Sequence, residues 1–498
     1  MNFRKPWAAF QKHIFWLIIL CLPLFFINIR DNHDWGGDFA QYIAQAENIA
    51  KGIPHWKTNY VFNPDAAVYG PAAYPPGFPL LISPVIKTFG IDFRALMIWQ
   101  TFFLLLFGLA SFYLFRRETG GLAALLLALL IVYHPWLLRF KSEIMSGIAF
   151  SFLFIFTTLL YLNRKNNKYY HIIYLAPLIA FLPFVRTIGL VYLVALLLLA
   201  IRYLYLVYLK KKNHYLSDNK FHLSLLAASL LFYSFIRYIL FPTPFGDPES
   251  YALLFNLNDL QHTLFSNISY YLEVLIQHFS LTSGQWAFVV VLVYSFFIVF
   301  FVLGLILKSI RDFAFTELLF LLYMGVLIVY PYRGSGFRFL LPVFPFMLMY
   351  AVHGAKFIKS GTKFHKDQVI SGIGIFILLL YLSGIRTIVR QQNTVVEGPQ
   401  KPASQELFNY IRKHTPAGAS IASIKPRVIA LFAERKSMGT FRDDSQEELE
   451  EQFNKFGVDY LLWFRLAGDE NFEAYIERNP AKLEKVFENR NFKLYKRD

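Results

Sequence analysis

One carboxylate in this sequence stands where chemistry at a membrane surface could take place. Asp38 comes soon after the first long apolar run, behind Gly36 and Gly37, which permit a sharp turn of the backbone. A carboxylate at the start of a helical pattern can simply cap free backbone amides. It can also act as a general base when a substrate hydroxyl comes within hydrogen-bond reach. The surrounding sequence is needed to distinguish these two roles.

The residues that follow Asp38 predict one short helix with a polar face. Gly52 and Pro54 are typical of a helix end, so the helix is expected to finish just before them. Helical spacing places five side chains on one face: Asp38, Gln41, Tyr42, Gln45 and Ile49. Glu47 lies on a different face, so it is not expected to be a second acid beside Asp38.

Composition places the chain among membrane proteins. It has 498 residues, of which 56% are hydrophobic and 16% are charged, whereas a soluble globular protein has about 25% charged residues. The apolar residues form long runs, which indicates a polytopic membrane protein. The single cysteine, Cys21, excludes a disulfide within the chain and a metal site built on cysteines.

The formal net charge of +16 could suggest nucleic acid as a partner, but its distribution argues against this. Residues 390–498 carry 18 Lys/Arg and 17 Asp/Glu, a net charge of +1. Residues 1–389 carry the other 31 Lys/Arg and 16 Asp/Glu, a net charge of +15. The basic excess therefore lies among the apolar runs, where it sets the orientation of membrane spans.

The apolar runs predict eleven membrane-spanning helices. Their ranges are residues 14–29, 93–115, 121–138, 144–162, 170–186, 188–209, 222–241, 286–308, 314–331, 338–357 and 369–389. Every second loop is rich in Lys and Arg, so the positive-inside rule places the N-terminus in the cytoplasm. Residues 31–92, the first loop, and the tail after residue 390 then lie outside the cytoplasm. The division of two spans at Arg186 keeps the later loops in this alternation.

The two longest outer segments differ in character. In residues 74–84, YPPGFPLLISP, four prolines argue against a regular span and favour a short helix along the membrane surface. The tail, residues 391–498, is expected to form a small α/β domain, separate from a transmembrane catalytic domain over residues 1–390. Its predicted helices are residues 405–414, 446–457 and 471–479, and its predicted strands are 420–424, 460–464 and 492–496. A structural or acceptor-recognition role is expected for it.

Several charged side chains are predicted at the outer membrane face, opposite the basic cytoplasmic loops. They include Lys141, Glu143, Arg186, Arg333 and Arg338. Arginine at membrane depth is costly, and it suits phosphate because its planar fork donates two hydrogen bonds at once. Arg186 could instead extend to the interface, and Glu143 could simply pair with a neighbouring base. His262 and His278 could be metal ligands, although histidines on amphipathic helices more often are not.

Five short motifs follow one another along the chain in a recognisable order. They are Gly37-Asp38 with Tyr42 and Gly52, Tyr74-Pro-Pro-Gly-Phe-Pro-Leu-Leu, Pro135-Trp-Leu-Leu-Arg-Phe with Ser142-Glu143, Val185-Arg186-Thr-Ile-Gly, and Arg338-Phe-Leu-Leu-Pro. On these motifs, residues 10–390 resemble the GT-C superfamily of integral membrane glycosyltransferases. The resemblance is strongest to the bacterial branch related to the dolichyl-phosphate-mannose–protein O-mannosyltransferases and the lipid A aminoarabinose transferases. The motifs in this order are specific for the superfamily and not for the substrate.

The resemblance implies catalysis at the outer face of a bacterial inner membrane, within the cell envelope. It implies a polyprenyl-phosphate-linked sugar as donor and a lipid, a glycan or a protein as acceptor. Asp38 matches the family's catalytic aspartate, and Arg186 and Arg338 match best the arginines near the lipid phosphate. Many relatives have Asp-Glu at the first position, whereas Phe39 follows Asp38 here. This departure leaves a second acid and a divalent metal open, and no other cofactor is expected.

The expected reaction is an inverting transfer of a hexosyl or pentosyl group, with Asp38 as general base. The leaving lipid phosphate is a weak base and needs no acid to protonate it, unlike the leaving group in glycoside hydrolysis. The residues expected to contact the donor phosphate or sugar are Tyr42, Tyr74, Lys141, Glu143, Arg186, Arg333 and Arg338.

Three other functions fit parts of the sequence. A transporter or flippase of an anionic polyprenyl-phosphate lipid would use the same arginines, but it predicts internal repeats and broken helices near mid-membrane, and the sequence has no repeat. A polymerase or ligase of lipid-linked glycans is not separated by the sequence from a single-sugar transferase. A scaffold that displays the tail would leave the outer charges unexplained.

Overall fold

The computed structural model describes residues 4–164, 168–211, 216–242, 259–279, 287–311, 313–330, 336–357, 366–392, 394, 396–440, 445–465 and 470–498. The chain divides into two compact units. The first, called here the helical unit, comprises residues 1–29, 97–240 and 256–393. The second, called here the mixed unit, comprises residues 30–96, 241–255 and 394–498.

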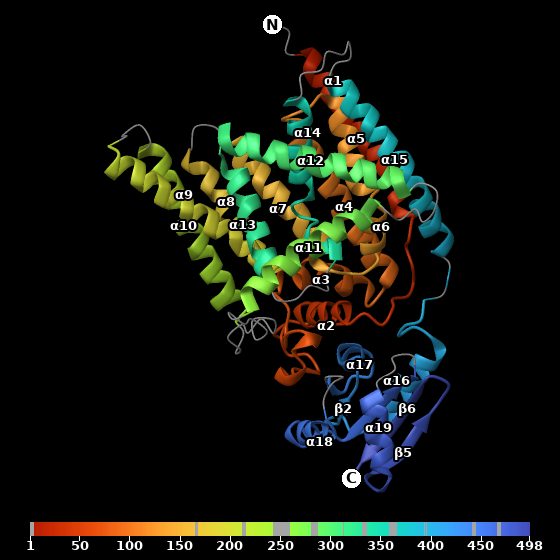
Figure 1. Cartoon of the computed structure of the whole chain (residues 1–498). Coiled ribbons are helices and arrows are strands. Elements are labelled where there is room, and N and C mark those ends of the chain that lie inside the picture. The colour runs from red at the N-terminus through yellow and green to blue at the C-terminus, as the bar shows by residue number, and fades with distance from the viewer. Residues whose placement is uncertain are drawn as a thin grey trace. The chain divides into compact units, whose positions relative to one another are not determined.

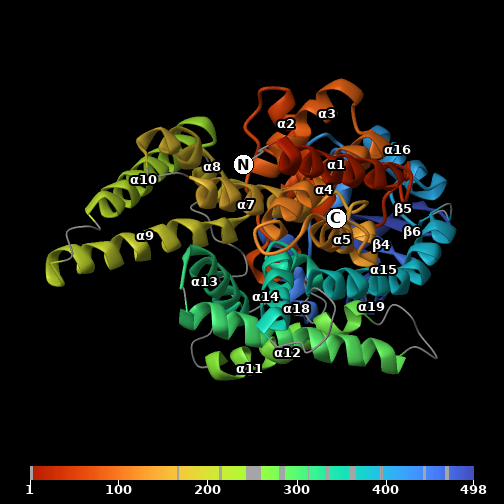
Figure 2. The same ribbon diagram turned by 90° about the horizontal axis from the view of Figure 1, so that it is seen from above.

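The described elements of the helical unit are all helices (Figure 1). They are α1 (Arg4–Cys21), α4 (Phe93–Phe115), α5 (Gly121–Val132), α6 (Pro135–Phe140), α7 (Ser146–Asn163), α8 (Ile172–Val185), α9 (Val191–Leu204), α10 (Leu216–Phe235), α11 (Leu260–Phe279), α12 (Ala287–Arg311), α13 (Phe315–Val329), α14 (Phe344–Phe357) and α15 (Lys366–Gln391), with short 3-10 and π segments between some of them. Helices α8, α9 and α10 pack together in one group (Figure 2).

The long apolar helices agree with the predicted spans. In the described part of the chain, six are long and apolar enough to cross a membrane: Phe93–Phe115, Ser146–Asn163, Thr187–Tyr208, Lys220–Leu240, Phe288–Arg311 and Lys366–Gln391. The other five predicted ranges contain shorter helices. The division predicted at Arg186 is present, because α8 ends at Val185 and Arg186 has extended backbone angles of φ −151° and ψ 133°. The helical membrane fold class is confirmed, while the count of eleven spans stays a prediction.

The mixed unit is built on a six-stranded sheet with the order β1-β3-β2-β4-β6-β5. The strands are β1 (Tyr60–Val61), β2 (Ser420–Ala422), β3 (Lys436–Met438), β4 (Tyr460–Phe464), β5 (Leu483–Glu488) and β6 (Phe492–Arg497). The helices are α2 (Asp38–Ala50), α3 (Gly77–Phe89), α16 (Pro402–His414), α17 (Pro426–Phe432), α18 (Gln446–Lys455) and α19 (Glu470–Arg478). The small sheet predicted for the tail is confirmed, but β3, β5 and α17 are not among the predicted elements.

One strand of this sheet comes from the first loop and not from the tail. β1 pairs in parallel with β3, with Tyr60 opposite Ser437. Just after β1, the Asn63 side chain donates to the Gly439 carbonyl at 3.1 Å and to the Gln452 side chain at 2.7 Å. Because these backbone and side-chain groups satisfy one another, the first loop and the tail fold as one unit. The expected domain boundaries, which place the first loop in the transmembrane domain, differ from this grouping.

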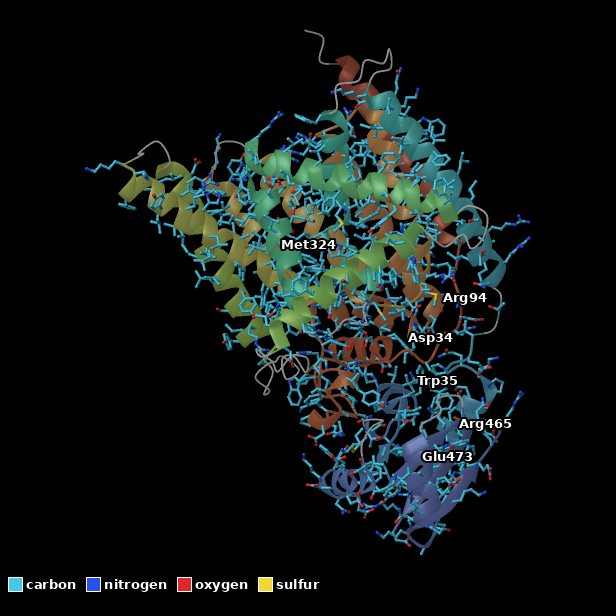
Figure 3. All side chains as sticks on the ribbon, in the orientation of Figure 1. Asp34, Trp35, Arg94, Met324, Arg465 and Glu473 are labelled. Carbon is cyan, nitrogen blue, oxygen red and sulfur yellow. The ribbon has the colours of Figure 1, made fainter. Side chains whose placement is uncertain are left out.

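Trp35 anchors the segment before α2 to the sheet of the same unit. Its ring lies 4.8 Å from that of Phe464 in β4 and 5.8 Å from that of Phe492 in β6, and 6.4 Å from the ring of Phe408 in α16 (Trp35 is labelled in Figure 3). Aromatic pairs at these separations are favourable contacts. The chain therefore enters α2 from a point fixed by residues of the tail.

In the helical unit, α12 and α14 approach closely through two glycines (Figures 1 and 2). A Cβ atom at Gly304 of α12 would lie 1.8 Å from the Tyr350 carbonyl oxygen. A Cβ atom at Gly354 of α14 would lie 2.1 Å from the Phe300 carbonyl oxygen. Both oxygens belong to the backbone, so neither can move aside without moving its helix. Small residues at a helix crossing let backbones pack closely in a membrane.

Replacing Gly304 with alanine should lower the free energy of unfolding by about 1–3 kcal/mol, the usual range for an overpacked site. Gly325 of α13 is a matched control, because nothing lies within 4 Å of the position that its Cβ would occupy. Gly325→Ala should be neutral, or stabilising by up to about 1 kcal/mol through better helix propensity. The measurement is the thermal unfolding midpoint of each purified variant in detergent. Equal midpoints for the two variants would contradict the close α12–α14 contact.

Candidate active site

The glycine turn that precedes α2 is held by its own side chains. Gly37 occupies the N-cap position of α2, so Asp38 is the first helical residue and not the cap. Asp34 Oδ1 accepts a hydrogen bond from the Gly36 amide at 2.8 Å and lies 3.0 Å from His33 Nδ1. Burial acts to raise the pKa of Asp34, but His33 and the Gly36 amide together lower it below its ordinary value. The His33 imidazole and the Asp34 carboxylate are also of the ligand types that a divalent metal accepts.

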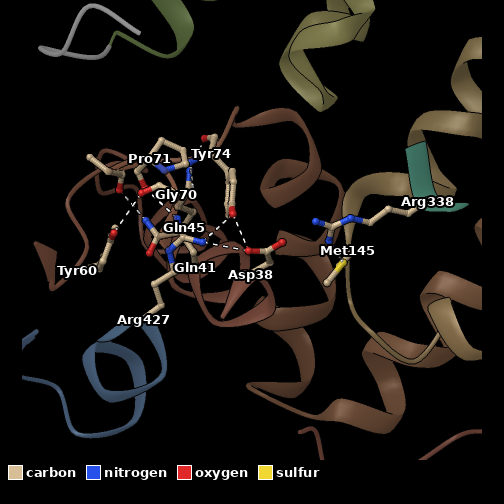
Figure 4. A network of polar contacts seen from close by, with 11 residues as sticks. Asp38, Gln41, Gln45, Tyr60, Gly70, Pro71, Tyr74, Met145, Arg338 and Arg427 are labelled. Atoms are coloured by element: carbon tan, nitrogen blue, oxygen red, sulfur yellow. Dashed lines mark hydrogen bonds and ion pairs between the residues drawn. The ribbon is translucent and has the colours of Figure 1, made fainter. Parts of the chain in front are cut away.

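Asp38 lies in a network of polar contacts within the mixed unit (Figure 4). The Tyr74 hydroxyl donates to Asp38 Oδ1 at 2.7 Å. Arg427 Nη1 donates to the same oxygen at 3.1 Å and to the Tyr74 hydroxyl oxygen at 2.7 Å. Arg427 Nη2 donates to the Pro71 carbonyl at 3.1 Å. One carboxylate oxygen of Asp38 is therefore fixed by two donors that also bind each other.

Arg427 supplies a buried positive charge to this network. Its guanidinium lies 4.9 Å from the ring centre of Tyr60 and 4.7 Å from that of Tyr74. Its side chain is 2% exposed, while that of Asp38 is 30% exposed. Burial acts to lower the pKa of Arg427, but Tyr74, Tyr60 and Asp38 raise it above its usual value. Arg427 therefore stays charged, and Asp38 is the member of the pair that a substrate can reach.

The polar face of α2 holds the segment that carries Tyr74. Gln45 bonds its backbone twice, accepting from the Tyr74 amide at 2.9 Å and donating to the Tyr74 carbonyl at 2.8 Å. Gln41 donates to the Ala72 carbonyl at 2.7 Å. Tyr42 is buried and stacks on the Tyr74 ring at 4.6 Å. The predicted face is present, and its residues fix the loop in which the Tyr74 hydroxyl reaches Asp38.

Two of the predicted arginines come together in the helical unit. The guanidinium of Arg186 lies 5.0 Å from the ring centre of Phe339, and that of Arg338 lies 5.6 Å from the same ring. Arg338 Nη1 also contacts Met145 Sδ at 3.1 Å, as Figure 4 shows. No acidic side chain among the residues that the structure describes forms an ion pair with Arg186. A cluster of two guanidinium groups around one ring is suited to an anion.

The segment between α6 and α7 supports this cluster. Lys141 is fully buried, and its ammonium donates to Thr101 of α4 at 3.3 Å. Glu143 is half-buried in the same segment. Ile144 has a positive φ of 46°, a strained conformation for a β-branched residue, and such strain is concentrated at functional sites. The next residue, Met145, accepts a hydrogen bond from the Gln100 side chain at 2.7 Å through its carbonyl.

Helix α11 contacts the described residues on both sides of residues 331–335, the segment in which Arg333 is predicted to bind a ligand. Arg333 itself lies outside the described residues. On one side, the buried Asn267 amide donates to the carbonyls of Ile328 at 2.8 Å and Tyr330 at 2.7 Å, which caps the end of α13. On the other side, the Tyr270 hydroxyl accepts from the Gly336 amide at 2.8 Å. The 3-10 turn Gly336–Phe339, which carries Arg338, starts from this contact.

The site contains one residue that the sequence analysis does not single out. Arg427 follows Lys425 and Pro426, and proline is a common first residue of a helix. That signal predicts the start of α17, but nothing local indicates that the arginine pairs with a carboxylate 389 positions away. The structure places the predicted site residues in two groups, each within one unit. Asp38, Tyr42 and Tyr74 lie in the mixed unit, and Lys141, Glu143, Arg186 and Arg338 lie in the helical unit.

Several solved structures are similar to this chain in fold. ArnT from Cupriavidus metallidurans bound to undecaprenyl phosphate is 12% identical and aligns over 97% of each chain, with a TM-score of 0.59. The archaeal oligosaccharyltransferase AglB from Archaeoglobus fulgidus, in complex with an inhibitory peptide and a dolichol-phosphate, is 14% identical, with a TM-score of 0.56 over 93% of this chain and 70% of that chain. The arabinofuranosyltransferase AftD from mycobacteria is 12% identical, with a TM-score of 0.53 over 97% of this chain and 40% of that chain.

These likenesses confirm the resemblance to the GT-C fold. A comparison with the sequences of curated proteins gave no match. One family model, described as "Predicted membrane protein (DUF2079)", matches residues 77–495, which is most of the chain. The chain thus has a GT-C fold and belongs to the DUF2079 family of predicted membrane proteins.

Proposed function

We propose that this protein is a membrane glycosyltransferase that moves a sugar from a polyprenyl-phosphate donor to an acceptor hydroxyl on the extracytoplasmic side. The observation that carries the proposal is Asp38, a partly exposed carboxylate with one oxygen fixed by Tyr74 and Arg427. The fold supports it, because structures of this fold include ArnT with undecaprenyl phosphate and AglB with a dolichol-phosphate.

In the proposed reaction, Asp38 accepts the proton of the acceptor hydroxyl. The acceptor oxygen attacks the anomeric carbon, and the bond from that carbon to the phosphate oxygen breaks. The configuration of the sugar inverts because attack comes from the side opposite the phosphate. The lipid phosphate leaves as an anion, so no general acid is required. A general base of this kind typically contributes about 10²–10⁴-fold to the rate.

The proposed donor site is the arginine cluster around Phe339. Arg186 and Arg338 lie within 5.6 Å of the centre of this ring. Guanidinium groups form charge-assisted hydrogen bonds to phosphate, often two from one arginine. These bonds strengthen as negative charge grows on the departing phosphate, so they stabilise the transition state more than the bound donor.

The same site would suit a donor that carries one sugar or a preassembled glycan. A flippase of the same lipid would also need the arginines, but it would not need a base. Removing the Asp38 carboxylate therefore distinguishes the two functions, because it should stop a transferase but not a flippase. Cells without the gene should accumulate a lipid-linked intermediate. Its size distinguishes a single-sugar transferase from a polymerase or ligase.

Asp38→Asn should reduce transfer by at least about 10²-fold, because an amide cannot accept the proton. Cells that lack the gene should accumulate a polyprenyl-phosphate sugar, measured by mass spectrometry of extracted lipids. The wild-type gene should clear this intermediate, and the Asp38→Asn variant should not. Glu47→Gln is the matched control: Glu47 lies in the same helix and only forms a surface ion pair with Lys51 at 3.7 Å. Clearance by Asp38→Asn at the wild-type rate would refute Asp38 as the base.

Arg186→Gln and Arg338→Gln should each weaken binding of undecaprenyl phosphate by about 10- to 100-fold, since a hydrogen bond to a charged group contributes about 1.5–3 kcal/mol. The measurement is the shift in thermal unfolding midpoint as undecaprenyl phosphate is titrated into purified protein. Arg94→Gln is the control, because Arg94 is exposed and pairs only at the surface with Asp31 at 3.2 Å. Asp38→Asn should keep the shift. An unchanged shift in both arginine variants would exclude this cluster as the phosphate site.

A further inference from the structure

Arg427 connects the tail to the first loop at the position of Asp38. It is the second residue of α17, a helix between β2 and β3 of the sheet, and α17 packs against α2. Its neighbours Val428 and Ile429 are buried. The backbone that carries Arg427 is therefore held by the core of the mixed unit.

Both terminal nitrogens of the Arg427 guanidinium are held by protein groups, while its buried Nε has no hydrogen-bond partner among the described residues. Nη1 bonds both the Tyr74 hydroxyl and Asp38 Oδ1, and Nη2 bonds the Pro71 carbonyl. The rings of Tyr60 and Tyr74 lie within 4.9 Å of it. A buried charge requires such partners. Because its own position is so constrained, Arg427 constrains in turn the carboxylate that it contacts.

Gly70 leaves room for this arrangement. A Cβ atom at Gly70 would lie 2.5 Å from Arg427 Nη2 and 3.2 Å from the Tyr74 hydroxyl oxygen. Its backbone angles of φ 86° and ψ 178° are those of a conformation that is essentially restricted to glycine. The loop thus has both the space and the conformation needed to accept an arginine from the tail.

We propose that Arg427 is a positioning residue for the base Asp38, so that the C-terminal α/β region takes part in the catalytic step. The inference rests on the proposed function. It assigns the tail a task beyond a structural or acceptor-recognition role. Arg427 does not touch the reacting atoms; it orients the carboxylate through Oδ1, directly and through Tyr74. A displacement of about 1 Å at a catalytic group can cost about 10²-fold in rate.

The test uses the full-length protein and the polyprenyl-phosphate sugar purified from cells without the gene. Arg427→Gln should lower the turnover of this lipid by about 100-fold while the thermal shift with undecaprenyl phosphate stays unchanged. Arg427→Lys should recover part of the lost turnover, because lysine keeps the positive charge. The recovery should be incomplete, because lysine cannot reach Asp38 and Pro71 with two fixed donors. A loss of turnover without a loss of phosphate binding is what a positioning role requires.

Arg435→Gln is the matched structural control. Arg435 is also a buried arginine of the mixed unit, but it donates to the carbonyls of Arg412 at 2.8 Å and Thr415 at 2.9 Å. Its loss should lower the unfolding midpoint while turnover per folded molecule stays near that of the wild type. If Arg427→Gln lost turnover only in proportion to its unfolded fraction, as expected for Arg435→Gln, Arg427 would be structural and the proposal would fail.

A second pair of variants moves Arg427 without removing it. Gly70→Ala places a methyl group against Nη2 and should lower turnover about tenfold or more. Gly90→Ala is its control, because Gly90 has a similar backbone conformation, φ 67° and ψ −153°, with nothing within 4 Å of its Cβ position. Both variants carry the same kind of backbone strain, so the contacts with Arg427 and with the Tyr74 hydroxyl that it binds distinguish them. Equal turnover in the two would count against the positioning role.

The two proposals fail in different ways. If Asp38→Asn is inactive and Arg427→Gln has wild-type turnover, the positioning role is wrong and the base remains. If Asp38→Asn is active, the proposed function is wrong, and the positioning of a base is wrong with it. A double-mutant cycle on the unfolding midpoint of Asp38→Asn, Arg427→Gln and the double variant should be non-additive whenever the two side chains are in contact. An additive cycle would overturn the contact itself.

Discussion

The constraint on which the mixed unit depends is the burial of one guanidinium group. A charge with 2% of its side chain exposed needs polar partners, because an unpaired buried charge costs several kcal/mol. Asp38, Tyr74 and Pro71 supply these partners, and all three come from the first loop. The tail cannot bury Arg427 without the loop, and without the tail the loop loses the guanidinium that pairs with Asp38. This ion pair therefore links two distant stretches of sequence within one compact unit.

Other contacts of the first loop act together with this ion pair. β1 extends the sheet by one short strand, which gives the backbone after Thr58 a partner in β3. Trp35 packs on the aromatic rings of β4 and β6 and fixes the entry to α2. Gln45 binds the backbone of Tyr74 on both sides. The position of the partly exposed Asp38 carboxylate is consequently set by elements from both ends of the chain.

Local patterns predict most helices and the polar face of α2, but not the long-range partner of Asp38. The apolar runs predict the membrane helices because hydrophobic length is a local property, and β4 is predicted at Tyr460–Phe464, where the structure has it. β1 has two residues and α17 has seven, too few to show a period in sequence. Asp38 can be selected from its place after two glycines. Arg427 cannot, because its role depends on a contact across 389 positions that sheet formation creates.

The positive charges of Arg427 and Arg186 are compensated by different groups, and this difference bears on function. Both terminal nitrogens of Arg427 are bonded within the protein, to a carboxylate, a hydroxyl and a carbonyl, and only its buried Nε has no hydrogen-bond partner among the described residues. Arg186 has the ring of Phe339 and no carboxylate among the described residues. A cation–π contact contributes only about 0.5–2 kcal/mol, less than the cost of a charge in an apolar environment. An arginine compensated in this way is stabilised further when an anion binds, which is the basis for proposing this cluster as the phosphate site.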